Sequence, residues 1–173
     1  MERFGFIHDK LEIKMLILFI LNRLPHPVDI NVLTDLVMCD DGISYFEFSQ
    51  SLAELVETEH VRCEDELYAV TQKGKRNGTE TESSLPYSVR HRAERSATKI
   101  SRMMKRSAMI KTGAVPRDDG SFTVNLALAD GVGDIMSMNV LAGSQAQADQ
   151  MEKNFRKNAE SLYNEIMTLL LNE

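Results

Sequence analysis

Basic side chains recur along the middle of the chain at the spacing of one face of a helix. Arg92, Arg95, Lys99, Arg102 and Arg106 follow one another at steps of three and four residues, which places them in one row if the segment is helical. Guanidinium and ammonium groups in a row can bind successive phosphates, because each supplies donors and a positive charge. The row therefore predicts a phosphate-tracking helix, and a solvated helix face without a partner is the alternative.

Polar side chains between residues 44 and 76 form a second group that could contact nucleic acid. Hydroxyl and amide groups can donate to phosphates or base edges, and basic residues can hold the backbone. The residues of both groups that we predict to contact DNA are Ser44, Tyr45, Gln50, Ser51, Arg62, Lys73, Lys75, Arg76, Arg92, Arg95, Lys99 and Arg102. The first four belong to one predicted helix, on which we expect Gln50 and Ser51 to be exposed.

The charge of the chain is unevenly distributed. The 173 residues carry a formal net charge of −6, which disfavours nucleic-acid binding because phosphate neutralisation supplies much of the affinity. Residues 73–111, however, contain eleven basic and three acidic residues, whereas residues 1–72 contain five basic and fourteen acidic ones. Acidic residues also occur where DNA contacts are expected, at Glu47, Glu54 and residues 64–66. Phosphate affinity would therefore come from the central segment.

Residue patterns typical of enzymes and metal sites are absent from the sequence. The histidines at positions 8, 26, 60 and 91 are scattered, and Cys39 and Cys63 lie in different predicted elements without a CxxC motif. Gly131 and Gly133 lack the third glycine and the following helix of a dinucleotide-binding loop. We therefore expect no enzymatic activity, no cofactor and no metal ion, and we expect both cysteines to act as small hydrophobic residues.

Hydropathy gives an expectation about location. No apolar run approaches the length of about eighteen residues that a membrane-spanning helix requires. Residues 1–5 lack the basic region and the small-residue cleavage site of a secretory signal. We expect a cytoplasmic protein without membrane contact.

Residues 44–74 must position most of the predicted contacts, and their pattern predicts a helix followed by a hairpin. After Ser44, a good N-cap, apolar residues recur at helical spacing. They are Tyr45, Phe48, Leu52, Leu55 and Val56. Short strand-like runs follow at residues 61–63 and 67–70, joined by the polar residues 64–66. Thr71 can cap the next helix, and Gly74 permits a close approach or a strained backbone.

Two more helices are predicted before this stretch. Asp9 and Glu12 match a capping box, and residues 11–24 are apolar on nearly all sides, which fits a buried helix. Pro25 and Pro27 end that helix, and residues 30–37 form a shorter one before a turn at residues 40–42. The order predicts a helix-turn-helix with a hairpin, and a generic three-helix cluster with a separate hairpin is the alternative.

The second half of the chain predicts a helix, three strands and a helix. The basic row lies on a predicted helix between Pro86 and Arg106. Three strands are then predicted at residues 108–116, 121–128 and 135–141, and apolar and polar residues alternate in the second of them. Turn residues at 118–120 and 131–134 join the strands. Ser144 caps a long last helix whose apolar stripe can cover one face of the small sheet. The fold class is therefore α+β, with an N-terminal domain at residues 1–84 and a smaller lobe at residues 85–173.

Helix, hairpin and Thr71-Gln72-Lys73-Gly74 together resemble the recognition helix and wing of bacterial winged-helix regulators. Over nearly its whole length the chain also resembles a family of bacterial winged-helix proteins called domain of unknown function 4364. The residues that carry this resemblance are residues 9–11, residues 44–48, residues 71–74 and the strand-rich C-terminal lobe. The resemblance implies a winged helix-turn-helix domain and a transcription regulator.

Two functional hypotheses follow. The first is a dimeric winged-helix regulator that binds double-stranded DNA through the helix that starts at Ser44. The second is a protein-interaction module, an adaptor, whose acidic helix and wing bind a basic partner without nucleic acid. Under either hypothesis we expect a homodimer, because the apolar first helix and the C-terminal leucines expose more apolar surface than a small lobe readily buries.

Overall fold

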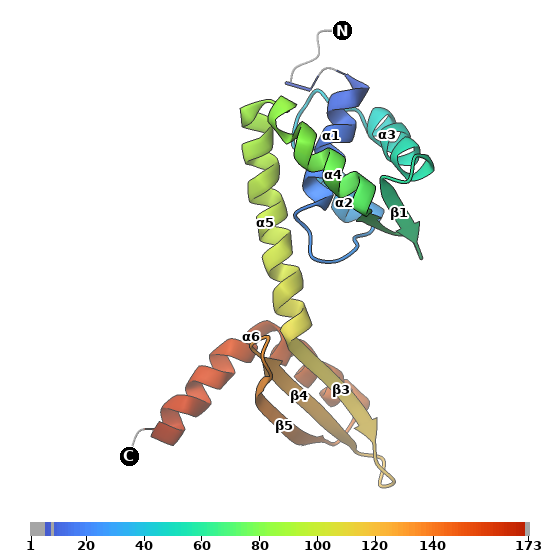
Figure 1. Cartoon of the computed structure of the whole chain (residues 1–173). Helices are drawn as coiled ribbons and strands as arrows, with labels where there is room; N and C mark the ends of the chain where they lie inside the picture. The colour runs from blue at the N-terminus through green and yellow to red at the C-terminus, as the bar shows by residue number, and fades with distance from the viewer. Residues whose placement is uncertain (1–5, 8, 172–173) are drawn as a thin grey trace. The chain divides into compact units, whose positions relative to one another are not determined.

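A computed structural model describes residues 6–7 and 9–171 of the chain. Within these residues it is an α+β protein with six α-helices and two small antiparallel sheets (Figure 1). The helices are α1 (Lys10–Leu21), α2 (Ile30–Val37), α3 (Tyr45–Glu57), α4 (Gln72–Thr81), α5 (Tyr87–Met109) and α6 (Gln145–Leu171), with a short 3-10 helix at Glu82–Ser84. The strands are β1 (Val61–Glu64), β2 (Leu67–Val70), β3 (Ile110–Pro116), β4 (Phe122–Ala129) and β5 (Asp134–Ala142).

The first compact unit extends to Met104 and is built around α1. The consecutive residues Leu16–Leu21 are all buried, because α2, α3 and α4 pack around this helix. Asp9 caps α1 by accepting from the Glu12 amide, and Ser44 and Glu47 form a complete capping box at α3. These caps confirm the predicted helix starts.

The hairpin of the first unit follows α3 directly. Strands β1 and β2 pair in antiparallel register from Val61 opposite Val70 to Glu64 opposite Leu67. Asp65 and Glu66 both have positive φ, 49° and 63°, the backbone expected of a two-residue hairpin turn. A single bridge between Val28 and Tyr68 ties β2 to the loop before α2.

The second compact unit begins at Lys105 and contains the sheet β3-β4-β5 with α6. Buried side chains of the central strand β4, such as Val124 and Leu126, alternate with exposed or half-buried ones and pack against Phe155 and Ala159 of α6. The three predicted strands and the helix after Ser144 are present. Gly120 takes a positive φ of 81° in the turn between β3 and β4, as its turn sequence predicts.

The two units divide within α5, later in the chain than the position 84/85 at which the sequence suggested a boundary. Leu85, Val89 and Ala93 belong to the apolar core of the first unit, and Ile100 and Met104 pack against it. The first part of α5 therefore completes the N-terminal core. Within the described residues, no helix is long and apolar enough to cross a membrane.

Candidate nucleic-acid interface

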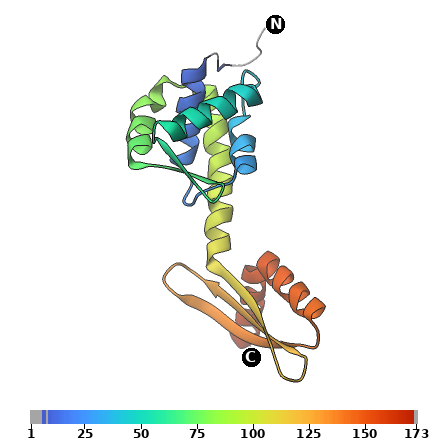
Figure 2. The same cartoon turned by 90° about the vertical axis from the view of Figure 1, so that its right-hand side faces the viewer.

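The outer face of α3 is exposed and uncharged over its first turns. Tyr45 and Phe46 are 58% and 75% exposed, and Ser49, Gln50 and Ala53 are exposed beside them. Figure 2, viewed from the α3 side, shows this helix crossing in front of the unit above the hairpin. Tyr45, predicted both for the apolar stripe and for DNA contact, therefore lies largely outside the core, although its ring contacts Phe48 with centroids 6.1 Å apart.

Two of the four predicted contacts are placed within the unit, Ser51 in the buried face of α3 and Ser44 at its N-cap. Ser51 is fully buried, so the expected exposure of this residue was wrong. It lies three residues after Phe48 and four before Leu55, on the face that packs against the core. The Ser44 hydroxyl accepts from the Glu47 amide at 3.2 Å and donates to the Glu47 carboxylate at 2.9 Å, so its hydrogen bonds belong to the helix cap.

Two of the three acidic residues of α3 are engaged within the unit, and the third, Glu57, is exposed at its C-terminal end. Glu47 is part of the capping box. Glu54 pairs with Lys10 and Lys14 of α1, the latter at 2.7 Å, and the hydrogen bonds from these two ammonium groups lower the pKa of Glu54. The negative charge predicted to repel DNA along α3 is thus compensated at these two positions.

Basic residues of the hairpin and α4 lie at the C-terminal end of α3. Lys73 donates from Nζ to the Thr58 carbonyl at 2.8 Å, and Arg62 and Lys73 line one surface groove. Lys75 and Arg76 follow on the exposed side of α4. Acidic side chains are nearby, because the hairpin tip at residues 64–66 is exposed and Arg62 approaches Glu64 to 3.9 Å.

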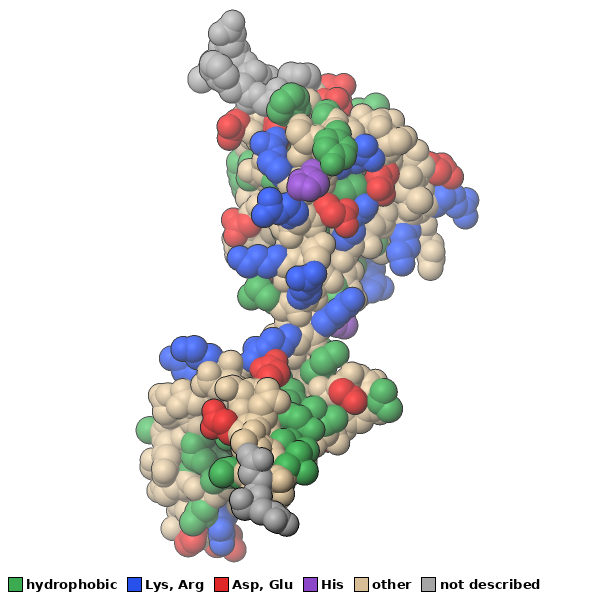
Figure 3. Space-filling model, turned by 90° about the vertical axis from the view of Figure 1, so that its left-hand side faces the viewer, with side chains coloured by type: hydrophobic (Ala, Val, Ile, Leu, Met, Phe, Trp, Pro, Cys, Tyr) green, Lys and Arg blue, Asp and Glu red, His purple; other side chains and the backbone are tan. Residues whose placement is uncertain are grey.

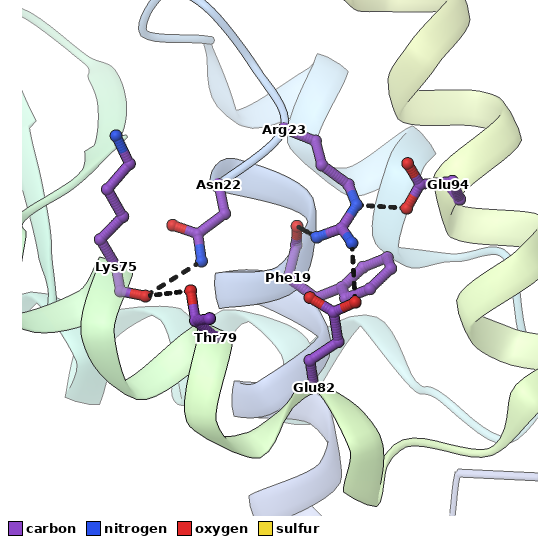
Figure 4. Close-up of polar contacts among 7 residues, drawn as sticks. All are labelled: Phe19, Asn22, Arg23, Lys75, Thr79, Glu82 and Glu94. Carbon is purple, nitrogen blue, oxygen red and sulfur yellow. Dashed lines mark hydrogen bonds and ion pairs between the residues drawn. The ribbon is translucent and has the colours of Figure 1, made fainter.

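Arg23 neutralises two of the three acidic residues of the basic central segment, residues 73–111, by forming ion pairs with them. Its guanidinium donates to Glu94 and, at 3.0 Å, to Glu82, and it lies 3.5 Å above the ring of Phe19 (Figure 4). The same close-up shows Asn22 and Thr79 bonded to the Lys75 carbonyl, while the Lys75 ammonium group points away from them. The Lys75 carbonyl is therefore held, while its ammonium group has no ion-pair partner among the residues that the structure describes.

The basic row of α5 is divided into paired ends and an unpaired middle. At one end Arg92 donates to the buried carboxylate of Asp40 at 2.7 Å, and at the other Arg106 binds both oxygens of Glu160 at 2.6 and 2.7 Å. The middle residues Arg95, Lys99 and Arg102 are exposed and have no ion-pair or hydrogen-bond partner in the part of the chain that the structure describes. Figure 3 shows blue side chains gathered on this face.

The α5 row and α3 do not share a face of the first unit. Helix α1 lies between α3 and the N-terminal part of α5 in Figure 1, and α5 lies behind α3 when the unit is viewed from the α3 side in Figure 2. The two groups of predicted contacts are therefore separated. Arg62, Lys73, Lys75 and Arg76 belong to the hairpin and α4, whereas Arg92, Arg95, Lys99 and Arg102 belong to α5.

Sequence reasoning missed three exposed residues of the α3 outer face. Phe46, Ser49 and Ala53 lie on it together with Tyr45 and Gln50. A helical projection that started from the buried positions Phe48, Leu52 and Leu55 would have found them, because they occupy the opposite direction.

Comparison with known families shows which family the chain belongs to. Residues 13–170 match the family described as Domain of unknown function (DUF4364). The chain belongs to this family. The match covers both units of this DUF4364 protein, from within α1 to the last turn of α6. No curated protein and no solved structure matches the chain.

Proposed function

We propose that this DUF4364 protein is a winged-helix DNA-binding transcription regulator in which α3 enters the major groove. The observation that supports this best is the outer face of α3, exposed and free of uncompensated charge from Tyr45 to Ala53, next to a hairpin. A helix of this size fits the major groove, where amide and hydroxyl groups can bond to base edges and apolar groups can contact the thymine methyl. Gln50 and Ser49 supply the polar contacts, and Phe46 and Ala53 the apolar ones.

Phosphate contacts in this proposal come from the hairpin and α4. Arg62, Lys73, Lys75 and Arg76 are the basic residues near the C-terminal end of α3. If these four neutralise four phosphates, the logarithm of the affinity should fall with the logarithm of the salt concentration at a slope of about −3.6. The acidic hairpin tip repels phosphates and keeps the affinity for DNA modest. Binding in this proposal therefore depends on where these four basic residues lie.

The test measures binding of the whole chain to a random-sequence duplex pool by fluorescence anisotropy over a range of salt concentrations. We expect Lys75→Ala/Arg76→Ala to weaken binding and to reduce the salt slope by about 1.8. The matched control is Arg95→Ala/Lys99→Ala, which removes the same charge from α5 and should leave the slope unchanged. A salt-independent response of the native chain, or equal losses in both variants, would reject the proposal.

A protein-interaction module is the second candidate, because two observations favour it. Tyr45 and Phe46 form an exposed aromatic pair on α3, and the hairpin tip at residues 64–66 presents three acidic side chains. Exposed aromatic residues are enriched at protein interfaces, and a polar rim surrounds them there. Under this function one basic protein partner should remain associated after nuclease treatment and be lost with Phe46→Ser. Loss of every associated protein on nuclease treatment would favour the regulator.

A further inference from the structure

Helix α6 changes direction at Asn158, and its apolar side chains become progressively more exposed toward the C-terminal end after the break. Asn158 has φ −124° and ψ 17°, outside the helical range. Before the break, Ala148 and Phe155 are buried against the sheet. Figure 1 shows the helix leaving the sheet after it. At the end of residues 160–171, which we call the arm, Leu169, Leu170 and Leu171 are 79%, 73% and 73% exposed.

Arg106 holds this break in place. It donates to the Lys157 carbonyl at 3.1 Å and binds the Glu160 carboxylate through two hydrogen bonds. Carbonyls at a helix break need donors from outside the helix, and the Arg106 guanidinium supplies one to Lys157. The hydrogen bonds from Arg106 to the Glu160 carboxylate lower the pKa of Glu160, which stays ionised at neutral pH. The direction of the arm is therefore stabilised by specific contacts within the second unit.

An open apolar groove lies where the arm leaves the sheet. Its volume is about 530 Å³ and its apolar lining is Leu126, Met138, Val140, Met151, Phe155 and Leu162. The side chains of the central strand β4 are buried there, but Met138 and Val140 on β5 are only half-buried, because α6 turns away at Asn158. The groove is the part of the second core that its own chain leaves uncovered.

We propose that the arm of a second copy of this chain occupies the groove, so that two chains exchange arms about a two-fold axis. Leu162 belongs to both the groove and the arm, so a two-fold axis near this residue brings each arm over the other groove, the reciprocal arrangement of an isologous dimer. Twelve helical residues span about 18 Å, enough to cross three strands whose outer axes are about 10 Å apart.

The charge distribution along α6 supports a buried arm. The half before the break carries five charged residues, which are Asp149, Glu152, Lys153, Arg156 and Lys157. The arm up to Leu171 carries Glu160, which is bound to Arg106, and Glu165. Its large apolar residues Leu162, Ile166 and Leu169 recur at steps of four and three residues, the spacing of a helix–helix contact. Such a segment loses little solvation of charge on burial.

The oligomeric state of the whole chain tests this exchange, and the test does not depend on DNA binding. Sedimentation of the native chain at micromolar concentration should give a dimer. Leu169→Gln/Leu170→Gln should weaken the dimer by at least about a hundredfold, since each buried leucine contributes about tenfold or more. Leu141→Gln is the matched control, because Leu141 is 58% exposed in the same unit but points away from the groove. It should leave the dimer intact.

A complementation experiment separates arm exchange from any other contact of the leucines. Val140→Glu blocks the groove but keeps the arm, whereas the double leucine variant keeps the groove but loses the arm. Each variant alone should be a monomer with native circular dichroism. Their mixture should form a mixed dimer, because one intact arm then meets one intact groove. A native chain that is monomeric, a dimer that survives both variants, or no association on mixing would overturn the proposal.

Discussion

Arg92 shows how a charged residue with the spacing of a binding row can instead hold the fold together. Its partner Asp40 is 2% exposed and also accepts from the backbone amides of Phe6, Ile7 and Gly42, at 3.0 to 3.3 Å. Burial alone would raise the pKa of Asp40, but the amide hydrogen bonds and the Arg92 guanidinium outweigh it and lower that pKa. The pair joins α5 to the turn before α3.

Asp40→Asn tests whether the ion pair between Asp40 and Arg92 stabilises the fold. We expect it to reduce the free energy of unfolding by about 1–3 kcal/mol at neutral pH, because an amide accepts fewer and weaker hydrogen bonds and leaves Arg92 without a charge partner. Because the folded-state pKa lies below the unfolded value of about 3.9, the carboxylate contribution is complete above that pH and is lost as the pH falls through the folded-state pKa. Urea unfolding of both proteins over a pH series should therefore converge at low pH. Asp41→Asn, at an exposed position in the same turn, should show no such convergence.

At the scale of elements, the sequence predicted what depends on local spacing and missed what depends on packing between elements. The caps at Asp9 and Ser44, the hairpin and the three-stranded sheet follow from periodicity and turn residues. The pairing of Arg106 with Glu160, 54 residues apart, has no local signal. The break at Asn158 likewise occurs in a segment with continuous helical periodicity, because a partner outside the helix stabilises it.

Helix α4 packs closely on the hairpin at Gly74, and a substitution there tests this contact. A Cβ atom at this position would lie 2.0 Å from the His60 carbonyl oxygen and 2.9 Å from Val70 Cγ2. This confirms that the glycine permits a close approach, since a backbone carbonyl cannot move aside cheaply. We expect Gly74→Ala to lower the free energy of unfolding by at least about 1–3 kcal/mol, measured by urea unfolding. Gly113→Ala is the control, because a Cβ there meets nothing within 4 Å. Equal effects of the two substitutions would show that the contact is not tight.

At the scale of the whole molecule, the chain places its two proposed surfaces in different compact units. The α3 face and the nearby cations belong to the first unit, and the arm and groove belong to the second. A division of this kind lets a dimerisation unit join two DNA-binding units, so that binding of the second half-site becomes intramolecular. The net charge of −6 then does not decide the function, because the charge local to each surface does.

Selection of binding sites from a random duplex pool tests whether the two surfaces act together. If arm exchange forms a two-fold dimer, the native chain should select inverted repeats with half-sites about 10 bp apart, or a multiple of that distance, because dimeric helix-turn-helix proteins match the helical repeat of DNA. Leu169→Gln/Leu170→Gln should select single half-sites of the same sequence with weaker binding, since its α3 face is unchanged, and Leu141→Gln should select the same repeats as the native chain. Selection of inverted repeats by the arm variant would show that DNA recognition does not depend on arm exchange. If the native chain enriched no sequence, the regulator proposal would be rejected, and sedimentation alone would test the dimer.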